Sequence, residues 1–143
     1  MEKIAGAVQR CLLVQAGEQE CALPLDRVRR VVRALQVHPL PGAAPALLGL
    51  AEYGGEPLPV LDLARLLGAP PTGAGATAVT VIVAVGPRGA TELVGLAAEA
   101  ALDIAETPLS ALPGNDHAMV VGEVLLAGRP VRVLDLGALG ATA

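Results

Sequence analysis

A spaced pattern of glycine, proline and aliphatic residues occurs twice in this 143-residue chain. The first copy comprises Gly49, Gly55, Pro57, residues 60–63 and Leu66, and the second comprises Gly122, Gly128, Pro130, residues 133–136 and Leu139. All matching positions are related by one constant offset, as from 49 to 122 or from 62 to 135. Matching glycines and a proline at fixed distances indicate a duplicated module. The sequence therefore predicts two small, similar halves.

Short aliphatic runs bounded by glycine, proline or charged residues predict strands. These runs are residues 12–14, 59–61, 79–85, 119–121, 124–126 and 131–133. Turn-forming glycines and prolines occur at 17–20, 54–57, 86–89 and 127–130, where they suit tight hairpin turns. Many short strands with frequent turns predict a mostly β fold made of small barrels.

The run Pro-Pro-Thr-Gly-Ala-Gly-Ala at 70–76 separates the two copies of the repeat. Such a run packs poorly and is typical of a linker. We expect a single domain over 1–143, because this length suits one hydrophobic core. Within it we expect a first barrel module at about 11–69, a linker at 70–76 and a second barrel module at about 77–140.

Two segments conflict with an all-β interpretation. Val28, Val31, Val32 and Leu35 have helical spacing after a candidate cap at Asp26, and residues 97–101 are rich in helix formers. The pattern alone predicts helix for both segments. Asp62 and Asp135 each precede Leu-x-x-Leu, so we expect their carboxylates to cap short helical turns.

Composition and charge exclude several classes of function. A net charge of −4 and a pI near 5.1 argue against nucleic-acid binding, which needs a clustered basic surface. Tyr53 is the only aromatic residue, so stacking on single strands is also not expected. The sequence has neither a secretion signal nor an apolar run long enough to insert in a membrane. We therefore expect a cytoplasmic protein.

No catalytic or metal-binding constellation is recognisable. Ser110 lies in no nucleophile motif, and His38 and His117 have no metal-ligand spacing to cysteines or carboxylates. Cys11 and Cys21 form no CxxC motif and are expected to be small buried hydrophobes. We therefore expect no enzyme activity, metal or cofactor. An enzyme or ligand-binding protein with a pocket around His38, Cys11 or Cys21 is the weakest of the alternatives.

An ordered set of short motifs resembles the CheW-like chemotaxis coupling proteins. The motifs are residues 20–28 (ECALPLDRV), Leu40-Pro41, Pro45 with Gly49, Gly55 with residues 59–63 (PVLDL), residues 94–96 (VGL), Gly122 and residues 134–136 (LDL). Each motif is weak by itself, but together they run in the family's order and spacing from about Cys11 to Leu139.

The resemblance implies two SH3-like five-stranded β-barrel subdomains around a shared aliphatic core, and it implies that the two helix-like segments are mostly strand. Similar proteins are adaptors without catalytic residues. They couple the cytoplasmic tip of a chemoreceptor to the regulatory domain of a chemotaxis histidine kinase. The implied function is that of a signalling adaptor in chemotaxis or a related motility pathway.

Site residues follow from the resemblance position by position. The apolar contacts that such proteins present to the kinase fall here on Leu12, Leu25 and Val28. Val28 is the residue we expect most to lie in a partner interface. An apolar side chain at these positions is also compatible with a place in the core.

Two departures from the family pattern bear on partner choice. The usual Asn-Leu-Arg-Gly signature is Glu52-Tyr53-Gly54-Gly55 here, so Gly54 replaces the arginine, and Arg30 stands where a glutamate is expected. One hypothesis is a swapped charge pair in which Arg30 faces Glu52 or Glu56; the other is that Arg30 is an ordinary surface residue. Glu99 replaces an aspartate with little expected effect on the fold. The alternative function is a divergent CheW-like module that docks another protein without kinase coupling.

Overall fold

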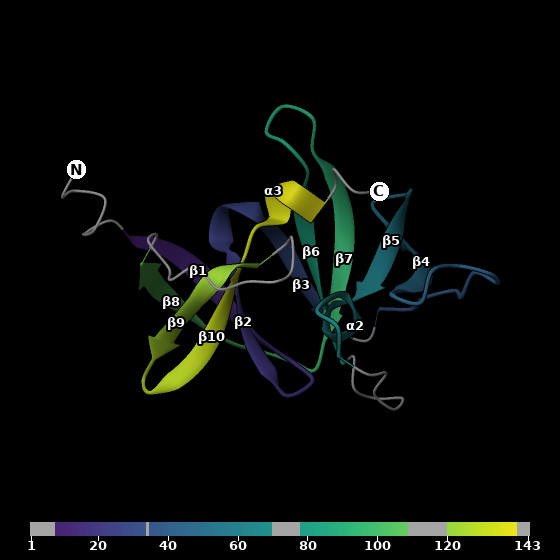
Figure 1. Cartoon of the computed structure of the whole chain (residues 1–143). Coiled ribbons are helices and arrows are strands. Elements are labelled where there is room, and N and C mark those ends of the chain that lie inside the picture. The colour runs from purple at the N-terminus through teal and green to yellow at the C-terminus, as the bar shows by residue number, and fades with distance from the viewer. Residues whose placement is uncertain (1–7, 34, 70–77, 109–119, 140–143) are drawn as a thin grey trace.

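The chain folds into two five-stranded β-sheets that lie side by side, with little helix (Figure 1). This computed structural model describes residues 8–33, 35–69, 78–108 and 120–139. In chain order the elements are β1 (Val8–Ala16), β2 (Gln19–Pro24), η1 (Leu25–Arg27), β3 (Val28–Arg33), β4 (Leu47–Tyr53), β5 (Glu56–Asp62), α2 (Leu63–Leu66), β6 (Val79–Val85), β7 (Glu92–Ala98), β8 (Ala100–Pro108), β9 (Val120–Leu126), β10 (Arg129–Leu134) and α3 (Leu136–Leu139). Among the described residues, no helix is long and apolar enough to span a membrane.

The sequence repeat is also a structural repeat, because β4, β5 and α2 recur as β9, β10 and α3 at the offset that relates the two sequence copies. The first sheet has the order β8-β1-β2-β10-β9, and the second has the order β3-β6-β7-β5-β4. Each sheet therefore combines two strands of one repeat with three strands of the other. The repeated hairpin takes the same place in both sheets, since β10 pairs in parallel with β2 and β5 pairs in parallel with β7.

Because strands are exchanged, the two sheets do not coincide with the two modules expected from the sequence. The boundaries at about 11–69 and 77–140 follow the repeats along the sequence, whereas the sheets draw strands from both sides of these boundaries. The expected linker at 70–76 lies outside the described residues. The expected mostly β fold of two SH3-like five-stranded subdomains is confirmed, with two sheets that are barrel-like.

The main core lies between the two sheets. Strand β1 contributes Leu12 and Val14, and β6 contributes Val81 and Val83, all from the faces that the sheets turn toward each other. Every residue of β6 is buried, as expected for a central strand covered on both faces. Two smaller clusters lie within the individual sheets. They are equivalent in the repeat, since Val131 and Val133 of one correspond to Leu58 and Val60 of the other.

The two segments with helical spacing are strands. Residues 28–33 form β3, and residues 97–101 span the end of β7 and the start of β8. The expectation of helix from spacing alone was wrong, because pairing of β3 with β6 and of β8 with β1 overrides local preference. The strands expected at 12–14, 59–61, 79–85, 124–126 and 131–133 are present, whereas Met119 lies outside the described residues.

The two predicted helix caps differ. The Oδ1 atom of Asp135 accepts a hydrogen bond from the backbone N–H of Gly137 over 3.0 Å, which confirms the cap at the start of α3. Asp62 precedes α2 but makes no side-chain cap bond. Its backbone N–H instead donates to the carbonyl of Ala46, and the residue is buried at the end of β5.

One glycine of the repeat is fixed by a close backbone contact. Gly49 has φ of +151°, and a Cβ atom there would lie only 2.1 Å from the carbonyl oxygen of His38. His38 and Leu50 exchange two backbone hydrogen bonds, which join the segment after β3 to β4. A side chain at position 49 would overlap this backbone, which explains why the chain needs glycine there.

Candidate functional site

The short helix η1 carries the chain from the first sheet to the second. Its residue Arg27 donates from Nη1 to the carbonyl of Ala84 over 3.2 Å and to that of Gly86 over 2.7 Å. Gly137 leaves room for the guanidinium, since a Cβ there would lie 3.1 Å from Arg27 Nη2. These bonds hold η1 against the end of β6, so the residues on either side of Arg27 have a fixed position.

Two of the predicted apolar contact residues lie beside this anchor. Leu25 and Val28 are half-buried and pack at the margin of the main core. Leu12 is only 8% exposed and lies within that core, so a partner would reach little of its side chain. The structure thus leaves Leu25 and Val28 partly accessible and places Leu12 beneath the surface.

Charged residues border the same region. The guanidinium of Arg88 lies 2.7 Å from a carboxylate oxygen of Asp26, and both side chains are well exposed. A cleft of about 260 Å³ between the sheets is lined by both residues together with Arg27, Asp135 and Leu136. An exposed ion pair of this kind contributes little to stability, at most about 1 kcal/mol. Its carboxylate and guanidinium remain accessible to polar groups of a partner.

Glu52 and Gly54 lie on the hairpin that joins β4 to β5. Gly54 and Gly55 have φ of +62° and +83°, as a two-residue hairpin turn with positive φ at both positions requires. A groove of about 420 Å³ runs along this hairpin and is lined by Glu52, Glu56, His38, Leu50 and Pro57, among others. It has an apolar floor and two exposed carboxylates.

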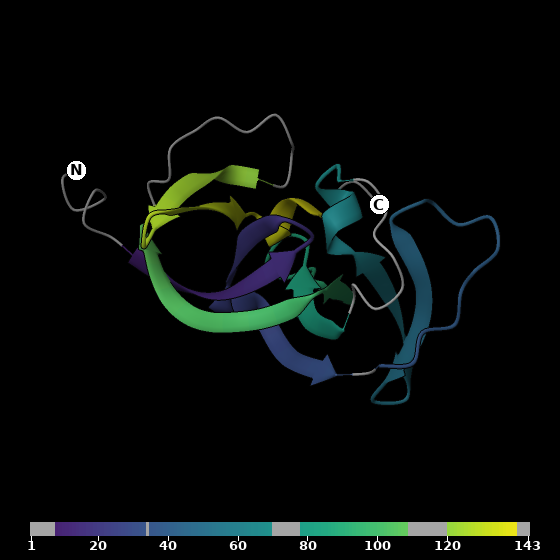
Figure 2. The same ribbon diagram turned by 90° about the horizontal axis from the view of Figure 1, so that it is seen from below.

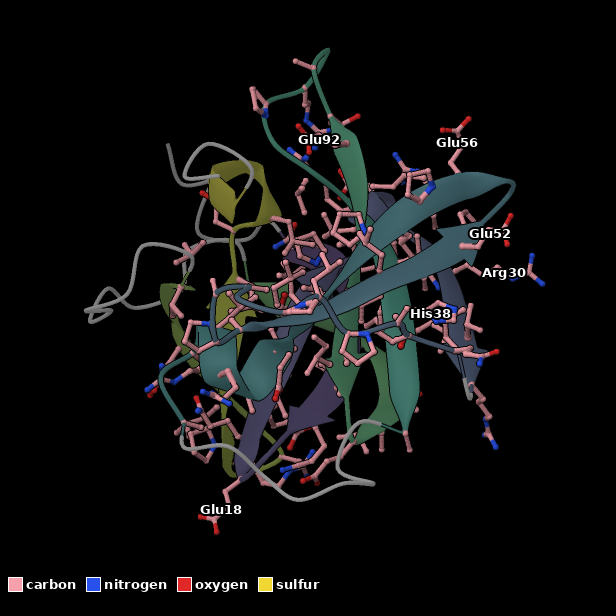
Figure 3. The ribbon with its side chains drawn as sticks, turned by 90° about the vertical axis from the view of Figure 1, so that its right-hand side faces the viewer. Glu18, Arg30, His38, Glu52, Glu56 and Glu92 are labelled. Atoms are coloured by element: carbon pink, nitrogen blue, oxygen red, sulfur yellow. The ribbon has the colours of Figure 1, made fainter. Side chains whose placement is uncertain are left out.

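The proposed charge pair between Arg30 and the hairpin is not formed. In Figure 3 the side chains of Arg30, Glu52 and Glu56 extend outward from the ribbon, and all three residues are exposed. Within the described part of the chain, no ion pair or hydrogen bond joins Arg30 to either glutamate. Arg30 lies on β3 and Glu52 on β4, which are the two outer strands of the second sheet. In the free chain Arg30 is therefore a solvated surface residue.

The cysteines are suited to packing rather than to chemistry. Both are fully buried. Burial raises the pKa of the Cys21 thiol to about 12 and also raises the pKa of Cys11, whose Sγ lies 3.2 Å from the hydroxyl of Thr107. Thiols protonated in this way are poor nucleophiles and poor metal ligands. Among the described residues, no three His, Cys, Asp or Glu side chains are grouped as a metal site. Ser110 and His117 lie outside the described residues.

The role of Arg27 as a positioning residue is not visible in the sequence. An arginine after an aspartate has no distinctive local pattern, and its partners Ala84 and Gly86 are 57 and 59 residues away. Comparison of the two copies of the repeat gives no signal for Arg27 either, because the equivalent residue in the second copy is Ala100 and not an arginine.

Comparison with known proteins agrees with this architecture. The structure is similar to the crystal structure of the scaffolding protein TtCheW from Thermoanaerobacter tengcongensis, with a TM-score of 0.77 and 19% sequence identity over 93% of this chain and 92% of that one. No curated protein sequence is significantly similar to this chain. The family model described as "CheW-like domain" matches residues 10–143, which is nearly the whole sequence. The chain therefore belongs to the CheW-like domain family.

Proposed function

We propose that this chain is a non-catalytic, cytoplasmic signalling adaptor that couples a chemoreceptor to a chemotaxis histidine kinase, in chemotaxis or a related motility pathway. The observation that supports this most is the match of the CheW-like domain model to residues 10–143, together with the partly accessible residues Leu25 and Val28 on either side of the Arg27 anchor. A preformed apolar patch beside charged residues suits docking of another folded domain.

In this proposal Val28 and Leu25 contact the regulatory domain of the kinase. Both side chains are partly exposed and would bury their remaining surface on binding, which is the main source of favourable free energy at such contacts. Leu12 supports the patch from below. Arg30 lies on β3 beyond Val28, and Glu52 and Gly54 lie on the β4–β5 hairpin. All three are exposed and are available to the receptor tip or to a second kinase surface.

The test is a calorimetric titration of the purified chain with the regulatory domains of chemotaxis-type kinases from the same genome. We expect saturable binding that Val28→Glu abolishes and Leu25→Ala weakens. Leu125→Glu is the matched control, because Leu125 lies on β9, is 73% exposed and undergoes the same kind of substitution, from an aliphatic residue to glutamate. Thermal unfolding of each variant separates lost binding from lost fold.

Absence of binding by a well-folded sample would contradict kinase coupling. It would favour the second candidate, a CheW-like module that docks a different protein. The observations behind this candidate are Gly54 and Arg30, which stand where the family has an arginine and a glutamate. The double variant Gly54→Arg/Arg30→Glu tests it: gain of kinase binding by this variant alone would show that these two positions set partner choice.

A further inference from the structure

Strand β9 is the repeat equivalent of β4, but the outer edges of the two strands differ. The offset of the repeat places residues 120–126 on residues 47–53, which are the bounds of β9 and β4. In β4, the backbone N–H and C=O of Leu50 bond to His38 over 2.9 and 2.8 Å, so the chain itself covers that edge. The equivalent residue in β9 is Glu123. Among the described residues, its backbone has no such outer partner.

The unbonded backbone groups of β9 point away from β10. Leu126 and Arg129 close the two-residue turn as a hydrogen-bonded pair, so the next pair, Leu125 and Pro130, does not exchange hydrogen bonds. Pro130 also has no N–H to donate. Leu125 and, by the alternation of the strand, Glu123 therefore direct their N–H and C=O groups outward. Together they present two donors and two acceptors at the spacing of a strand.

The side chains along this edge are mainly aliphatic. Leu125 is 73% exposed, the highest value among the exposed large aliphatic side chains of the described residues, and Val121 is 43% exposed. Glu123 lies between them, and Arg132 on β10 is its ion partner at 3.5 Å. This pair balances the carboxylate within the chain. Figure 2 shows β9, in yellow-green, along the outside of the first sheet.

The other three outer strands have features that oppose pairing with a strand of another protein. Strand β4 is bridged by His38, β3 contains three arginines, and β8 contains two acidic residues. A covering segment and charged side chains are usual protections of sheet edges. Strand β9 has one charged residue, which is paired with β10, and no covering segment among the described residues. It is the edge best suited to accept a further strand.

We propose that the outer edge of β9 binds an extended, uncharged segment of a partner protein as an added antiparallel strand. The first copy of the repeat is the template, because there His38 forms an antiparallel bridge to Leu50. In the second copy the partner supplies the strand, and its backbone bonds to Glu123 and Leu125. An aliphatic side chain of the segment packs on Leu125. Backbone bonds give the affinity of such added strands, and alternate side chains give their specificity.

The experiment is an NMR titration of the full chain with a short blocked peptide of alternating threonine and valine. We expect binding at millimolar concentration, with shifts confined to β9 and β10. At saturation, the amide protons of Glu123 and Leu125 should exchange at least about tenfold more slowly. The same peptide N-methylated at alternate residues keeps its side chains but loses the donors that face β9. It should not bind.

A variant tests the outward backbone donor on the protein side. Leu125→Pro removes this N–H without removing a bond to β10, and proline is tolerated on an edge strand. It should weaken peptide binding at least about tenfold. Leu125→Thr keeps the N–H and should weaken binding only about threefold. Glu52→Pro is the matched control at the equivalent position of β4, also opposite a proline, and should leave peptide binding unchanged.

Three results would overturn the proposal: no change at β9 with millimolar peptide, equal binding of the N-methylated peptide, or full affinity in a folded Leu125→Pro variant. A dimer of the free chain that Leu125→Pro abolishes would assign the edge to a second copy instead. The inference goes beyond the proposed function and does not depend on it, because neither a kinase nor a receptor takes part in the titration.

Discussion

Arg27 donates a hydrogen bond of 2.7 Å to the carbonyl of Gly86, across the boundary between the two sheets. Arg27 ends the short helix that follows β2, and Gly86 directly follows β6. The backbone N–H of Gly86 donates in turn to the carbonyl of Leu136 in α3. Three segments that are distant in sequence are therefore joined at this point. The geometry of the candidate partner-binding residues Leu25 and Val28 depends on this junction.

We expect Arg27→Met to lower the free energy of unfolding by about 1.5–3 kcal/mol, because a charged donor that serves two backbone carbonyls is lost. Chemical denaturation measures the change. Arg88→Met is the matched control: it removes the exposed ion pair with Asp26 and should cost at most about 1 kcal/mol. Equal effects of the two substitutions would show that the junction does not depend on Arg27.

Gly49→Ala should destabilise the protein by at least about 3 kcal/mol, because the new Cβ would overlap the carbonyl oxygen of His38 and the backbone could only move by breaking the bonds to Leu50. Thermal and denaturant unfolding report this loss. Gly54→Ala, where no atom lies within 4 Å of the new Cβ, should cost only about 1–2 kcal/mol for its positive φ. A milder effect at position 49 than at 54 would contradict this account.

Ala127→Gly should stabilise the chain by about 0.5–1 kcal/mol. Ala127 adopts φ of +51° in the β9–β10 turn, where the equivalent position in the first repeat is Gly54. Glycine stabilises the folded state because it adopts the left-handed conformation without strain. Part of this stabilisation is offset because glycine also increases the conformational entropy of the unfolded chain. Denaturant unfolding tests this, and Gly128→Ala, at φ of +79°, should shift stability in the opposite direction.

Stability should fall in acid partly through Glu20. Two hydrogen bonds of 2.9 Å from Arg129 lower the pKa of Glu20 below its ordinary value of 4.5. The resulting stability is present above pH 4.5 and is lost as the pH falls through the lower pKa of the folded state. Glu20→Gln should reduce stability near neutral pH by at most about 1 kcal/mol and flatten its decline in acid. An unchanged pH profile of the variant would rule out this contribution.

Neither cysteine should react with a thiol reagent in the folded protein near neutral pH. Both side chains are fully buried and both thiol pKa values are raised, that of Cys21 to about 12. Labelling should therefore occur only through unfolding and should accelerate with added denaturant. Rapid labelling of the native chain would show that one thiol is accessible, and peptide mapping would identify it.

Several parts of the fold were predictable because their causes are local or periodic. The strands at 59–61 and 79–85 follow from aliphatic runs, and the hairpins at 54–57 and 127–130 follow from glycines that tolerate positive φ. The cap at Asp135 was also predicted correctly. Around Val28 the spacing alone predicts a helix, whereas the segment is the strand that the family resemblance implied. Spacing fails here because the strand depends on pairing with β6, which is distant in the sequence.

The candidate site was predictable only in part. Resemblance to the family singled out Leu25 and Val28, and the structure places both at the surface beside Arg27. The resemblance could not separate Leu25 and Val28 from Leu12, because an aliphatic residue has the same sequence pattern whether it lies in the core or at its margin. Whether Arg30, Glu52 and Gly54 take part in partner binding stays a prediction.

The sequence by itself determined that this protein is a duplicated, aliphatic, mostly β chain, since glycine spacing, hairpin turns and strand runs are encoded within short windows. Only the tertiary structure decided that the repeats exchange strands, that Arg27 connects the two sheets, and that the outer strands β3 and β8 border one groove. The physical reason is that strand pairing is set by hydrogen bonds and burial between distant segments. A strand's own residues show that it needs a partner and leave open which strand that partner is.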